Sequence, residues 1–532
     1  MSGLNTPLTP LRFLERAAEV YPSSIAIVDG DRRLTYTEFA SAAQRLANAL
    51  IAHGVRRGER VAYLASNSAE LLIAHFGVPL AGAVLVAVNT RLSSEEVAWI
   101  CAHSQARVLF GDADLLQGLD TSSLSALSTI EVPSQTGEYV GIGTSYEDFL
   151  AAGTGEELPW EVGDENSTIS INYTSGTTGR PKGVMYTHRG AYLRTLGEVV
   201  HQGFGRSSRY LWTLPMFHCN GWCSTWAVTA AAGRHVCVRA VRGSEMWQLV
   251  DEEGITHLSG APIVATTLAT APEAHPLDRP LTVVTGGAPP SPSLIEKISA
   301  LGADLVQVYG LTETYGPYAS CEVQEEWSRL PAAERAALQA RQGVGMLTSD
   351  RVRVVRQGTG PLEDVTADGI EMGEIVMRGN TVMKGYLDDP VATEEAFAAG
   401  WFHSGDLGVM YPDGHIRLLD RAKDVVISGG ENISTIEVEQ ALDSHPAVAD
   451  VVVIGVPDDK WGERPKAFVV LTARITVTEE ELIAHVKGKI ASYKAPRSVE
   501  FVDALPRTST GKVRKNELRD AEWASSALRI NG

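Results

Sequence analysis

Several features that define specialised classes of protein are missing from this sequence. Only five cysteines occur among 532 residues, an odd and scattered set, which favours reduced thiols over a disulfide network. The N-terminus lacks the basic start and the long apolar run of a secretory signal. Internal repeats and low-complexity tracts are also missing. These absences disfavour a disulfide-stabilised secreted domain and a repeat protein, and we expect a cytoplasmic protein.

Positive charge is scarce as well. Lysine and arginine number 46 against 65 aspartates and glutamates, and the net charge of −19 disfavours non-specific binding to nucleic acid or anionic membranes. The longest apolar run, residues 71–88, is interrupted by His75, Gly77, Pro79 and Gly82, and a proline breaks a membrane-spanning helix. We interpret this run as a buried helix followed by a buried strand. We expect no nucleic-acid partner and no integral membrane segment.

Strand-like apolar runs alternate with helical patterns over most of the chain. Residues 60–65 and 84–88 have patterns typical of strands, and residues 68–75 have the pattern of a helix. Repetition of this order predicts mostly parallel sheets covered by helices, with ligands bound at the carboxyl ends of the strands. Residues 120–159 are richer in serine, threonine, glycine and glutamate, and we expect them to run over the surface.

The length exceeds what one hydrophobic core normally organises, so two or more domains are expected. The pattern changes near Asp420, and the roughly 110 residues beyond it are enough for a small independent domain. We predict an α/β fold with two domains. The N-terminal domain, residues 1–420, has mostly parallel sheets flanked by helices, and residues 421–532 form a small, mobile α+β lid domain.

A loop rich in glycine and hydroxyl groups is the most informative stretch. After an alternating strand at 169–173 comes Thr174-Ser175-Gly176-Thr177-Thr178-Gly179, followed by Lys182. Glycines let the backbone N–H groups approach an anion, hydroxyls add donors, and the lysine supplies a compact positive charge. Pro181 stands where a Walker P-loop requires its second glycine, and no G-x-G-x-x-G pattern is present here. We predict a phosphate-binding loop of another kind.

This loop resembles the signature of the adenylate-forming superfamily, which includes acyl-CoA synthetases, beetle luciferases and peptide-synthetase adenylation domains. Further stretches are similar to the motifs of that superfamily in the same order, over nearly the whole chain. They are Gly286–Pro289, Tyr309–Thr314, Trp401–Asp406 with Asp420–Arg421, and Pro506–Lys512. The sequences of residues 216–223 and 428–434 are most similar to those of short- and medium-chain acyl-CoA ligases, such as methylmercaptopropionate-CoA ligases and plant acyl-activating enzymes.

The resemblance implies an AMP-forming acid–thiol ligase that acts in two half-reactions. A small-molecule carboxylate attacks the α-phosphate of ATP and gives acyl-AMP and pyrophosphate. The thiol of CoA then attacks the acyl carbon and releases AMP. ATP, Mg²⁺ and CoA are therefore the implied cofactors and co-substrates, and because relatives are often dimers, a homodimer is also consistent with the resemblance.

In the first half-reaction two anions must meet, so the resemblance assigns groups that stabilise negative charge as catalytic. Lys512 bridges the carboxylate and the α-phosphate, and Thr312 offers a hydroxyl to that phosphate. Glu313 holds Mg²⁺, a metal that uses few protein carboxylates beside phosphate oxygens.

The resemblance also implies a nucleoside site. Tyr309 stacks on adenine, Asp406 accepts hydrogen bonds from the ribose hydroxyls, and Arg421 donates to the ribose or a phosphate. The complete set predicted to bind ATP or AMP is Thr174, Ser175, Gly176, Thr177, Thr178, Lys182, Gly287, Ala288, Pro289, Gln307, Tyr309, Gly310, Thr312, Asp406, Arg421 and Lys512.

The second half-reaction needs a rebuilt site, because a lysine placed for phosphate chemistry obstructs entry of the thiol. Members of the superfamily rotate the small domain, and the resemblance places the hinge at Lys423. Ser428, Gly429 and Gly430 would then face the CoA tunnel, although a plain β-turn also accounts for these glycines. The basic tail at residues 487–515 is suited to the phosphates of CoA or, equally, to a solvated face.

The resemblance also implies an acyl pocket, which follows an expected strand at Tyr210–Leu214. Its residues are His218, Cys219, Asn220, Trp222, Gly286 and Gly310. We discount zinc at His218, Cys219 and Cys223, because no fourth ligand lies at a plausible spacing. The bulk of Trp222 favours a short or medium acyl chain, and relatives also use aryl acids, so the acid itself stays open.

Two other functions deserve comparison with the acyl-CoA ligase. An adenylating enzyme could pass the acyl group to a carrier-protein thiol, an amine or a small nucleophile, but the sequence contains no carrier domain after Lys512. A non-catalytic nucleotide-binding protein with the same fold would lack Lys512, Glu313 or Asp406, and all three are present. The ligase that uses CoA is therefore our leading prediction.

Overall fold

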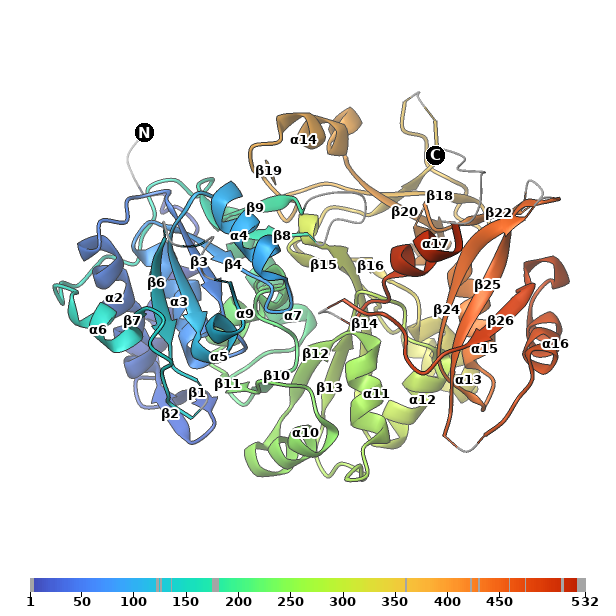
Figure 1. The fold of residues 1–532 in the computed structure, drawn as a ribbon, viewed down its shortest axis with the longest axis horizontal. Helices are drawn as coiled ribbons and strands as arrows, with labels where there is room; N and C mark the ends of the chain where they lie inside the picture. Colours follow the sequence, from blue (N-terminus) through green and yellow to red (C-terminus); the bar gives the residue numbers. More distant parts are fainter. Residues whose placement is uncertain are drawn as a thin grey trace.

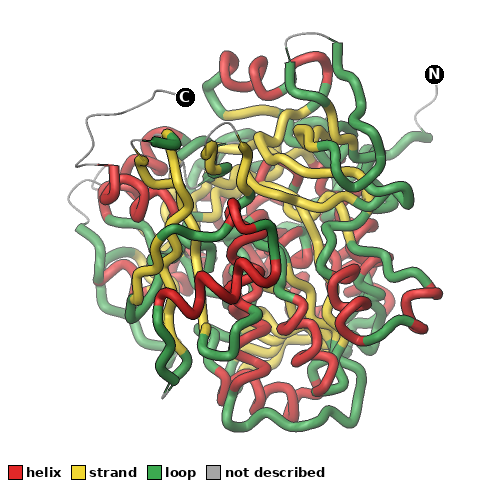
Figure 2. The backbone as a smooth tube through the Cα atoms, turned by 90° about the vertical axis from the view of Figure 1, so that its right-hand side faces the viewer, coloured by secondary structure: helices red, strands yellow, loops and turns green. Residues whose placement is uncertain are grey.

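A computed structural model provides the fold and side-chain positions. It describes residues 4–120, 124, 127–134, 136–174, 181–358, 361–421, 423–428, 431–458, 460–473, 475–508 and 511–523. The larger N-terminal part contains two mostly parallel sheets with helices around them, and the C-terminal part packs beside it as a smaller unit (Figure 1). Figure 2 shows the molecule from the C-terminal side, with helices in front of strands. The predicted α/β class is confirmed, whereas the boundary at residue 420 and the mobility of the lid stay predictions.

The first sheet has nine strands within the described part of the chain, and five of its neighbouring pairs are parallel. In spatial order they are β16 (Val344–Gly345), β15 (Gly316–Ser320), β14 (Asp304–Leu311), β13 (Thr282–Thr285), β12 (His257–Gly260), β10 (Arg209–Trp212), β11 (Arg234–Cys237), β1 (Ile25–Asp29) and β2 (Arg32–Thr35). The run from β14 to β1 is parallel, so these strands end at one common edge.

The second sheet, again counted over the described residues, has eight strands. Their order is β19 (Gly385–Tyr386), β9 (Gly183–Thr187), β8 (Thr168–Tyr173), β4 (Val84–Ala87), β3 (Arg60–Leu64), β5 (Ala106–Asp112), β6 (Ser128–Val132) and β7 (Thr144–Ser145). The strands from β8 to β7 are parallel, while β9 and β19 are antiparallel to their neighbours. This antiparallel edge brings the short strand β19 beside the start of β9.

Two smaller sheets complete the fold, and both are largely antiparallel. One consists of β17 (Arg353–Val355), β18 (Met372–Met377), β20 (Phe402–Met410) and β21 (Ile416–Arg421). The other, in the C-terminal part, consists of β23 (Glu431–Ile433), β22 (Val426–Ser428), β25 (Gly462–Leu471) and β24 (Val448–Asp458), with β26 (Ser498–Phe501) on β25. The chain passes from one sheet to the other between β21 and β22.

Helices cover both faces of the large sheets. The α-helices of the N-terminal part are α1 (Leu11–Val20), α2 (Tyr36–Ala52), α3 (Ala69–Leu80), α4 (Ser94–His103), α5 (Ala113–Gln117), α6 (Tyr146–Ala151), α7 (His188–His201), α9 (Ser224–Ala230), α10 (Gly243–Leu249), α11 (Pro262–Thr270), α12 (Pro292–Ala300), α13 (Ala332–Gln339) and α14 (Pro390–Ala396). The C-terminal part has α15 (Thr435–Asp443), α16 (Glu479–Lys489) and α17 (Lys515–Trp523). Several helices begin where a side-chain oxygen accepts from the third helical N–H, as Thr35 does for α2.

The apolar run at 71–88 is a buried helix and a buried strand, as predicted. Every residue of α3 is buried, and the helix continues through Pro79 for one residue before it ends. Strand β4 is buried along its length. None of the helices in the described residues is long and apolar enough to cross a membrane.

The prediction that residues 120–159 only run over the surface is wrong in part. Within this segment β6 lies between β5 and β7, and Ile130, Glu131 and Val132 are buried. The Glu131 carboxylate accepts hydrogen bonds from the backbone N–H groups of Gly141 and Ile142, so it holds the next loop. The strand begins with polar residues and contains a buried glutamate, so its sequence lacks the alternation of apolar and polar residues that would have predicted a strand.

Buried histidines make the stability of this fold depend on pH. Burial lowers the pKa of His75 and His188 to about 4 and that of His235 to about 3. Nδ1 of His235 accepts from the indole N–H of Trp212 at 3.1 Å, so the neutral ring fits this site. Because an unfolded histidine binds a proton below about pH 6.5, the unfolded state then binds more protons than the folded state.

We therefore expect the free energy of unfolding to fall as the pH drops below about 6.5, by roughly 1.4 kcal/mol per pH unit for each of these histidines. Asp112 works in the opposite direction below about pH 6, because burial raises its pKa to about 6. Urea unfolding at about pH 7.5 and about pH 5.5 measures the difference. The variant His235→Gln should show a weaker dependence on pH, and equal stability of the native chain at both values would contradict the argument.

Candidate active site

The predicted motifs meet at the carboxyl edge of the parallel strands. Strand β13 leads into the segment Gly286–Pro289, and β14 carries Gln307, Tyr309 and Gly310 before the 3₁₀ turn Thr312–Thr314. Strand β8 leads into Thr174, whose N–H donates to the carbonyl of Lys182 at 3.0 Å. This common edge is where parallel sheets bind their ligands.

Part of the prediction lies outside the described residues. This holds for Ser175, Gly176, Thr177 and Thr178 of the glycine-hydroxyl loop, and for Gly429 and Gly430 of the expected CoA tunnel. The other predicted residues have defined positions. Their functional roles stay predictions, whereas their arrangement in space is described below.

One carboxylate organises the expected nucleoside end of the site. The hydroxyl of Tyr309 donates to Oδ2 of Asp406 at 2.7 Å, and Nε of Arg421 lies 2.8 Å from Oδ1. Asp406 and Arg421 are direct partners in the β20–β21 register, which explains why two distant motifs meet. The Asp406 side chain is only 4% exposed, and its charge raises the pKa of Arg421. This group is pre-positioned by β-sheet pairing, before any ligand arrives.

The expected phosphate end of the site is built around the 3₁₀ turn. Glu313 accepts a hydrogen bond from the hydroxyl of Tyr386 at 2.9 Å, and its backbone carbonyl accepts from the N–H of Met383 at 2.7 Å. The carbonyl of Thr312 accepts from Tyr186 at 2.6 Å. The carboxylate of Glu313 is therefore oriented by a tyrosine that the motifs did not predict.

Tyr386 also connects the turn to the glycine-hydroxyl loop. Nζ of Lys182 lies 4.8 Å from the centre of the Tyr386 ring, within the range of a cation–π contact. The pairing of Tyr386 with Val184 across β19 and β9 produces this proximity. Burial and the charge of Glu313 raise the pKa of Tyr386, so it remains a donor. No sequence signal marks Tyr386, because β19 has only two residues.

The side chains around the 3₁₀ turn offer few ligands to a metal ion. No group of three or more histidines, cysteines or acidic residues that could hold a metal occurs in the described ranges. Glu313 is a single oriented carboxylate beside the phosphate end of the site, and Mg²⁺ commonly takes one or two carboxylates together with phosphate oxygens. The residues present therefore fit a Mg²⁺ ion that arrives with a nucleotide.

Lys512 reaches this site from the C-terminal part of the chain. A methyl group placed on Gly287 would lie 2.9 Å from Cε of Lys512, so the lysine stem lies directly against the Gly286–Pro289 segment. Burial, followed by the charge of Arg421, lowers the pKa of Lys512, while Asp406 and Glu313 act in the opposite direction. The residues predicted to act on the α-phosphate are thus brought together.

Gly511 determines how the Lys512 loop sits on the N-terminal part. It has a φ of +85°, and a Cβ there would lie 2.8 Å from Cγ2 of Ile263 and 3.3 Å from Cβ of Ala261. Within the loop, the N–H of Lys512 donates to Oγ1 of Thr508 at 3.1 Å, and the N–H of Thr508 donates to the Lys512 carbonyl. Thr508 and Lys512 are therefore bonded to each other, and Gly511 lies against the start of α11.

We expect Gly511→Ala to slow acyl-adenylate formation by about 10–100-fold, because a displacement of Lys512 by about 1 Å is costly for phosphoryl chemistry. The alanine needs a left-handed backbone and meets Ile263. Exchange of labelled pyrophosphate into ATP measures the step. Gly488→Ala, in α16 with open space around it, is the matched control. Equal exchange rates in the two variants would show that the docking of this glycine is unimportant.

The expected acyl pocket begins with an unusual backbone. Five consecutive residues, Cys219 to Cys223, have φ between +51° and +61°, so the short element α8 (Cys219–Trp222) is a left-handed turn. Only Gly221 adopts this region without a steric penalty, and each other residue costs roughly 1–2 kcal/mol. A Cβ on Gly221 would clash with the ring of Trp212, which explains the glycine. The turn persists because packing on every side determines it.

Trp222 is the residue that this turn delivers to the pocket. It is buried, and its indole lies against two glycines: a Cβ on Gly286 would be 3.0 Å from Cη2, and one on Gly316 would be 2.7 Å from Cδ1. Gly310 lies behind them, where β14 approaches the backbone of β15 too closely for any side chain. The indole therefore fills the space between the carboxyl end of β13 and the start of β15.

Among the other predicted pocket residues, Asn220 supports the turn, whereas Cys219 and His218 lie near Thr312 and Lys512. The Asn220 amide is fully buried and donates to Oγ of Ser170 at 2.8 Å and to Asn172 at 3.1 Å, so it supports the turn from behind. The Cys219 thiol lies 3.7 Å from Oγ1 of Thr312. Burial, with the charge of Lys512, lowers the pKa of His218 to about 3, so its ring is neutral at physiological pH.

The expected hinge lies between β21 and β22. Lys423 is exposed there, and the N–H of Asp424 donates to the carbonyl of Arg421 at 2.8 Å. The Asp424 carboxylate pairs with Arg519 of α17 at 2.6 Å. Ser428 ends β22 and faces Glu431 across the β22–β23 pair. A short connection between two sheets has the form of a hinge.

The sequence of this chain is also similar to those of known proteins. Residues 14–387 match the AMP-binding enzyme family, and residues 437–512 match the AMP-binding enzyme C-terminal domain. An acetate–CoA ligase of Humulus lupulus is 42% identical over 98% of this chain and 96% of its own length. A peroxisomal acetate/butyrate–CoA ligase of Arabidopsis thaliana is 41% identical over 97% of this chain and 94% of its own length.

Solved structures agree in fold. An anthranilate CoA ligase in complex with anthranoyl-AMP has a TM-score of 0.87 and 26% identity, and each chain is covered to 99%. ATP-bound MatB from Rhodopseudomonas palustris has a TM-score of 0.85 and 27% identity, over 97% of this chain and 99% of that one. With both family regions in order along its length, the chain belongs to the AMP-binding enzyme family.

Proposed function

We propose that this chain is an ATP-dependent, AMP-forming acyl-CoA ligase that acts on a short- or medium-chain or aryl carboxylic acid. The observation that carries the proposal is the position of Lys512 against Gly287, beside the Glu313 turn and the Asp406–Arg421 pair. A lysine brought from a separate C-terminal unit to a phosphate site is suited to joining two anions. The named CoA ligases among the relatives support the same reaction.

In the first half-reaction Lys512 stabilises the negative charge that develops between the carboxylate and the α-phosphate of ATP. The Thr312 hydroxyl donates to the same phosphate, and Asp406 and Tyr309 hold the nucleoside. Glu313, oriented by Tyr386, is the residue that would hold Mg²⁺, which supplies charge neutralisation at the departing pyrophosphate. The neutral ring of His218 lines the carboxylate entrance without repelling Lys512.

In the second half-reaction Lys512 must withdraw so that the CoA thiol can reach the acyl carbon. We propose that the part of the chain after Lys423 rotates about that residue, which brings Ser428 and its neighbours toward the pantetheine chain. The Lys512 loop contacts α11 through Gly511, and this contact must be released for the rotation. The domain boundary at residues 420 and 421 belongs to the same proposal.

The size of the acid follows from Trp222. Its indole fills the space between Gly286 and Gly316, and this favours a short acyl group over a long chain. Names among the relatives include acetate, butyrate, 2-methylpropanoate and benzoate CoA ligases, all of which act on small acids. We propose an acid of this size class for this chain.

AMP release from ATP and Mg²⁺ tests the function directly. A panel of aliphatic and aryl acids is assayed with CoA and without it. AMP that requires both one acid and CoA supports the ligase and identifies the acid. Acid-dependent pyrophosphate exchange without CoA-stimulated AMP would favour another acceptor, such as a carrier-protein thiol or an amine. If no acid of the panel gives AMP or pyrophosphate exchange, the proposal is contradicted.

The variant Trp222→Gly tests the pocket. We expect it to raise the ratio of kcat/KM for hexanoate over acetate by at least about tenfold, because one methylene is worth about 1–3 kcal/mol in an apolar pocket. Glycine also accepts the left-handed backbone of this position. Trp461→Gly, at a partly exposed tryptophan of the C-terminal part, is the control. An unchanged ratio in Trp222→Gly would place the acid elsewhere.

Two finer proposals complete this assignment. We propose a homodimer, which sedimentation analysis of the purified chain tests.

We also propose a cytoplasmic location, although the Arabidopsis relative is named as peroxisomal. Imaging of a tagged chain distinguishes the two compartments.

A further inference from the structure

A cavity of about 370 Å³ lies at the other edge of the nine-stranded sheet, away from the catalytic motifs. Its lining comes from the starts of three neighbouring strands: Arg209 begins β10, Arg234 begins β11, and Thr256 precedes β12. The acyl-pocket segment follows the carboxyl end of β10. The length of this strand therefore separates the cavity from the active site.

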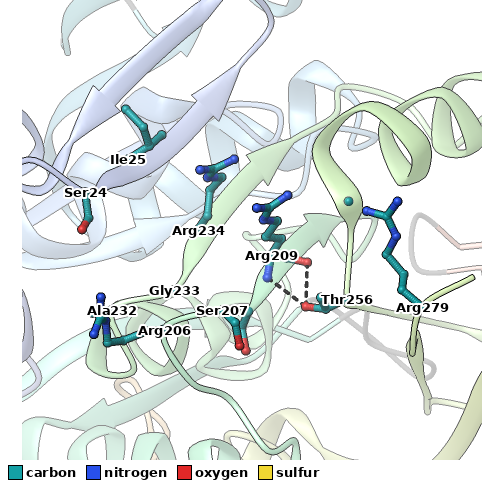
Figure 3. A pocket seen from close by; sticks show the side chains of 12 residues that line it. Ser24, Ile25, Arg206, Ser207, Arg209, Ala232, Gly233, Arg234, Thr256 and Arg279 are labelled. Atoms are coloured by element: carbon teal, nitrogen blue, oxygen red, sulfur yellow. Dashed lines mark hydrogen bonds between the residues drawn. The ribbon is translucent and has the colours of Figure 1, made fainter.

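Four arginines line this cavity: Arg206, Arg209, Arg234 and Arg279 (Figure 3). Arg209 and Arg234 are direct register partners on adjacent strands, so their side chains are neighbours. Burial, followed by the charge of Arg209, lowers the pKa of Arg234. The arginines of this cavity therefore repel one another, and a bound anion would relieve the repulsion.

The glycine at position 254 lets two of these guanidinium groups converge. Gly254 has a φ of +65°, and a Cβ there would clash with Nη1 of Arg279 and lie 2.8 Å from Nη1 of Arg209. Figure 3 shows Arg279 reaching toward Arg209 from the opposite wall. Any other residue at 254 would occupy the point where the two cations meet.

The nearby carboxylates neutralise only part of this charge. Glu253 is divided between Arg33 at 2.6 Å and Arg234 at 3.2 Å. Asp278 pairs with Arg279 at 3.0 Å, but this carboxylate is 83% exposed, and exposed pairs contribute little.

The remaining two arginines have other contacts. Nη1 of Arg209 donates to the backbone carbonyl of Glu253, and the guanidinium of Arg206 lies 4.7 Å from the centre of the Tyr21 ring. Over the described ranges, neither of these arginines forms an ion pair with a carboxylate. Arginines therefore outnumber their acidic partners around the cavity.

We propose that this cavity binds a diphosphate group, either as free inorganic pyrophosphate or as part of a nucleoside diphosphate. Planar guanidinium groups donate paired hydrogen bonds that match phosphate oxygens. Four arginines around one cavity, two of which meet at Gly254, supply more charge than a single carboxylate needs, and the hydroxyls of Ser24 and Ser207 add donors at the wall. The site is separate from the ATP site and does not depend on the acyl-CoA ligase function.

Binding of pyrophosphate and of ADP, measured by isothermal titration without Mg²⁺, tests this proposal. The variant Arg206→Gln/Arg279→Gln removes the two exposed arginines at the rim. The control Arg242→Gln/Arg351→Gln removes two exposed arginines elsewhere, one of which also has an acidic neighbour. Hydrogen–deuterium exchange at residues 206–209 and 254–256 locates the ligand, so binding at the ATP site is recognised separately.

We expect the native chain and the control to bind pyrophosphate or ADP with slower exchange at both segments, and the rim variant to bind at least about tenfold more weakly there. Tighter binding of ADP identifies a nucleotide, and tighter binding of pyrophosphate identifies the free anion. Unchanged exchange at these segments with saturating ligand would overturn the proposal. Equal affinity of the rim variant and the control at this site would also overturn it.

Discussion

Replacement of Lys512 by alanine is expected to slow acyl-AMP formation by about 1,000-fold, the loss typical of removing one pre-positioned charge-stabilising group. The same variant should convert supplied acyl-AMP and CoA into acyl-CoA at nearly the native rate. The reason is geometric, because Lys512 lies at the phosphate end of the site and the proposed second half-reaction requires its withdrawal. Pyrophosphate exchange and thioester formation from synthetic acyl-AMP measure the two steps.

Lys297→Ala serves as the control for this experiment, since Lys297 is an exposed lysine on α12 outside the site. It should leave both steps unchanged. An equal loss of both steps in Lys512→Ala would refute the division between the half-reactions. Retention of pyrophosphate exchange would remove Lys512 from the first step altogether.

The variant Lys423→Pro should produce the opposite pattern. Proline fixes φ near −65°, so the connection between β21 and β22 loses the freedom to change conformation. We expect acyl-AMP formation to continue near the native rate, and thioester formation from acyl-AMP to fall by about 100-fold, because the second arrangement is not reached. The same two assays distinguish these outcomes.

Lys423→Ala removes the same side chain and leaves the backbone free, so it should retain both steps. If Lys423→Pro performs both steps normally, the hinge lies at another residue. If alanine and proline are equally harmful, the lysine side chain matters and backbone rotation does not.

The fold class and the meeting of the motifs could be predicted because they depend on local patterns. Alternating strands and helices predicted parallel sheets, and parallel sheets collect their loops at one edge. Lys512, Glu313 and Asp406 were identified by short motifs, and the structure places them in one site. The pairing of Asp406 with Arg421 needed the register of β20 and β21, which sequence alone does not specify.

The supporting residues were not predictable for specific physical reasons. Tyr386 orients Glu313 from a strand of two residues, too short to leave a periodic pattern. The left-handed turn at Cys219–Cys223 contains cysteine and tryptophan at positive φ, against their own preferences. Tertiary packing determines both features, so local sequence patterns do not predict them.

The place of the Asp406–Arg421 pair along the chain has a consequence for how AMP is held. Asp406 and Arg421 both precede Lys423, and the sheet that joins them is continuous up to β21. Lys512, by contrast, lies on the far side of the proposed pivot. In the proposed rotation, the group at the phosphate is therefore exchanged while the contacts proposed for the ribose remain assembled. The contribution of the ribose contacts to AMP binding is then a property of the N-terminal part, and it should be the same in either orientation of the lid.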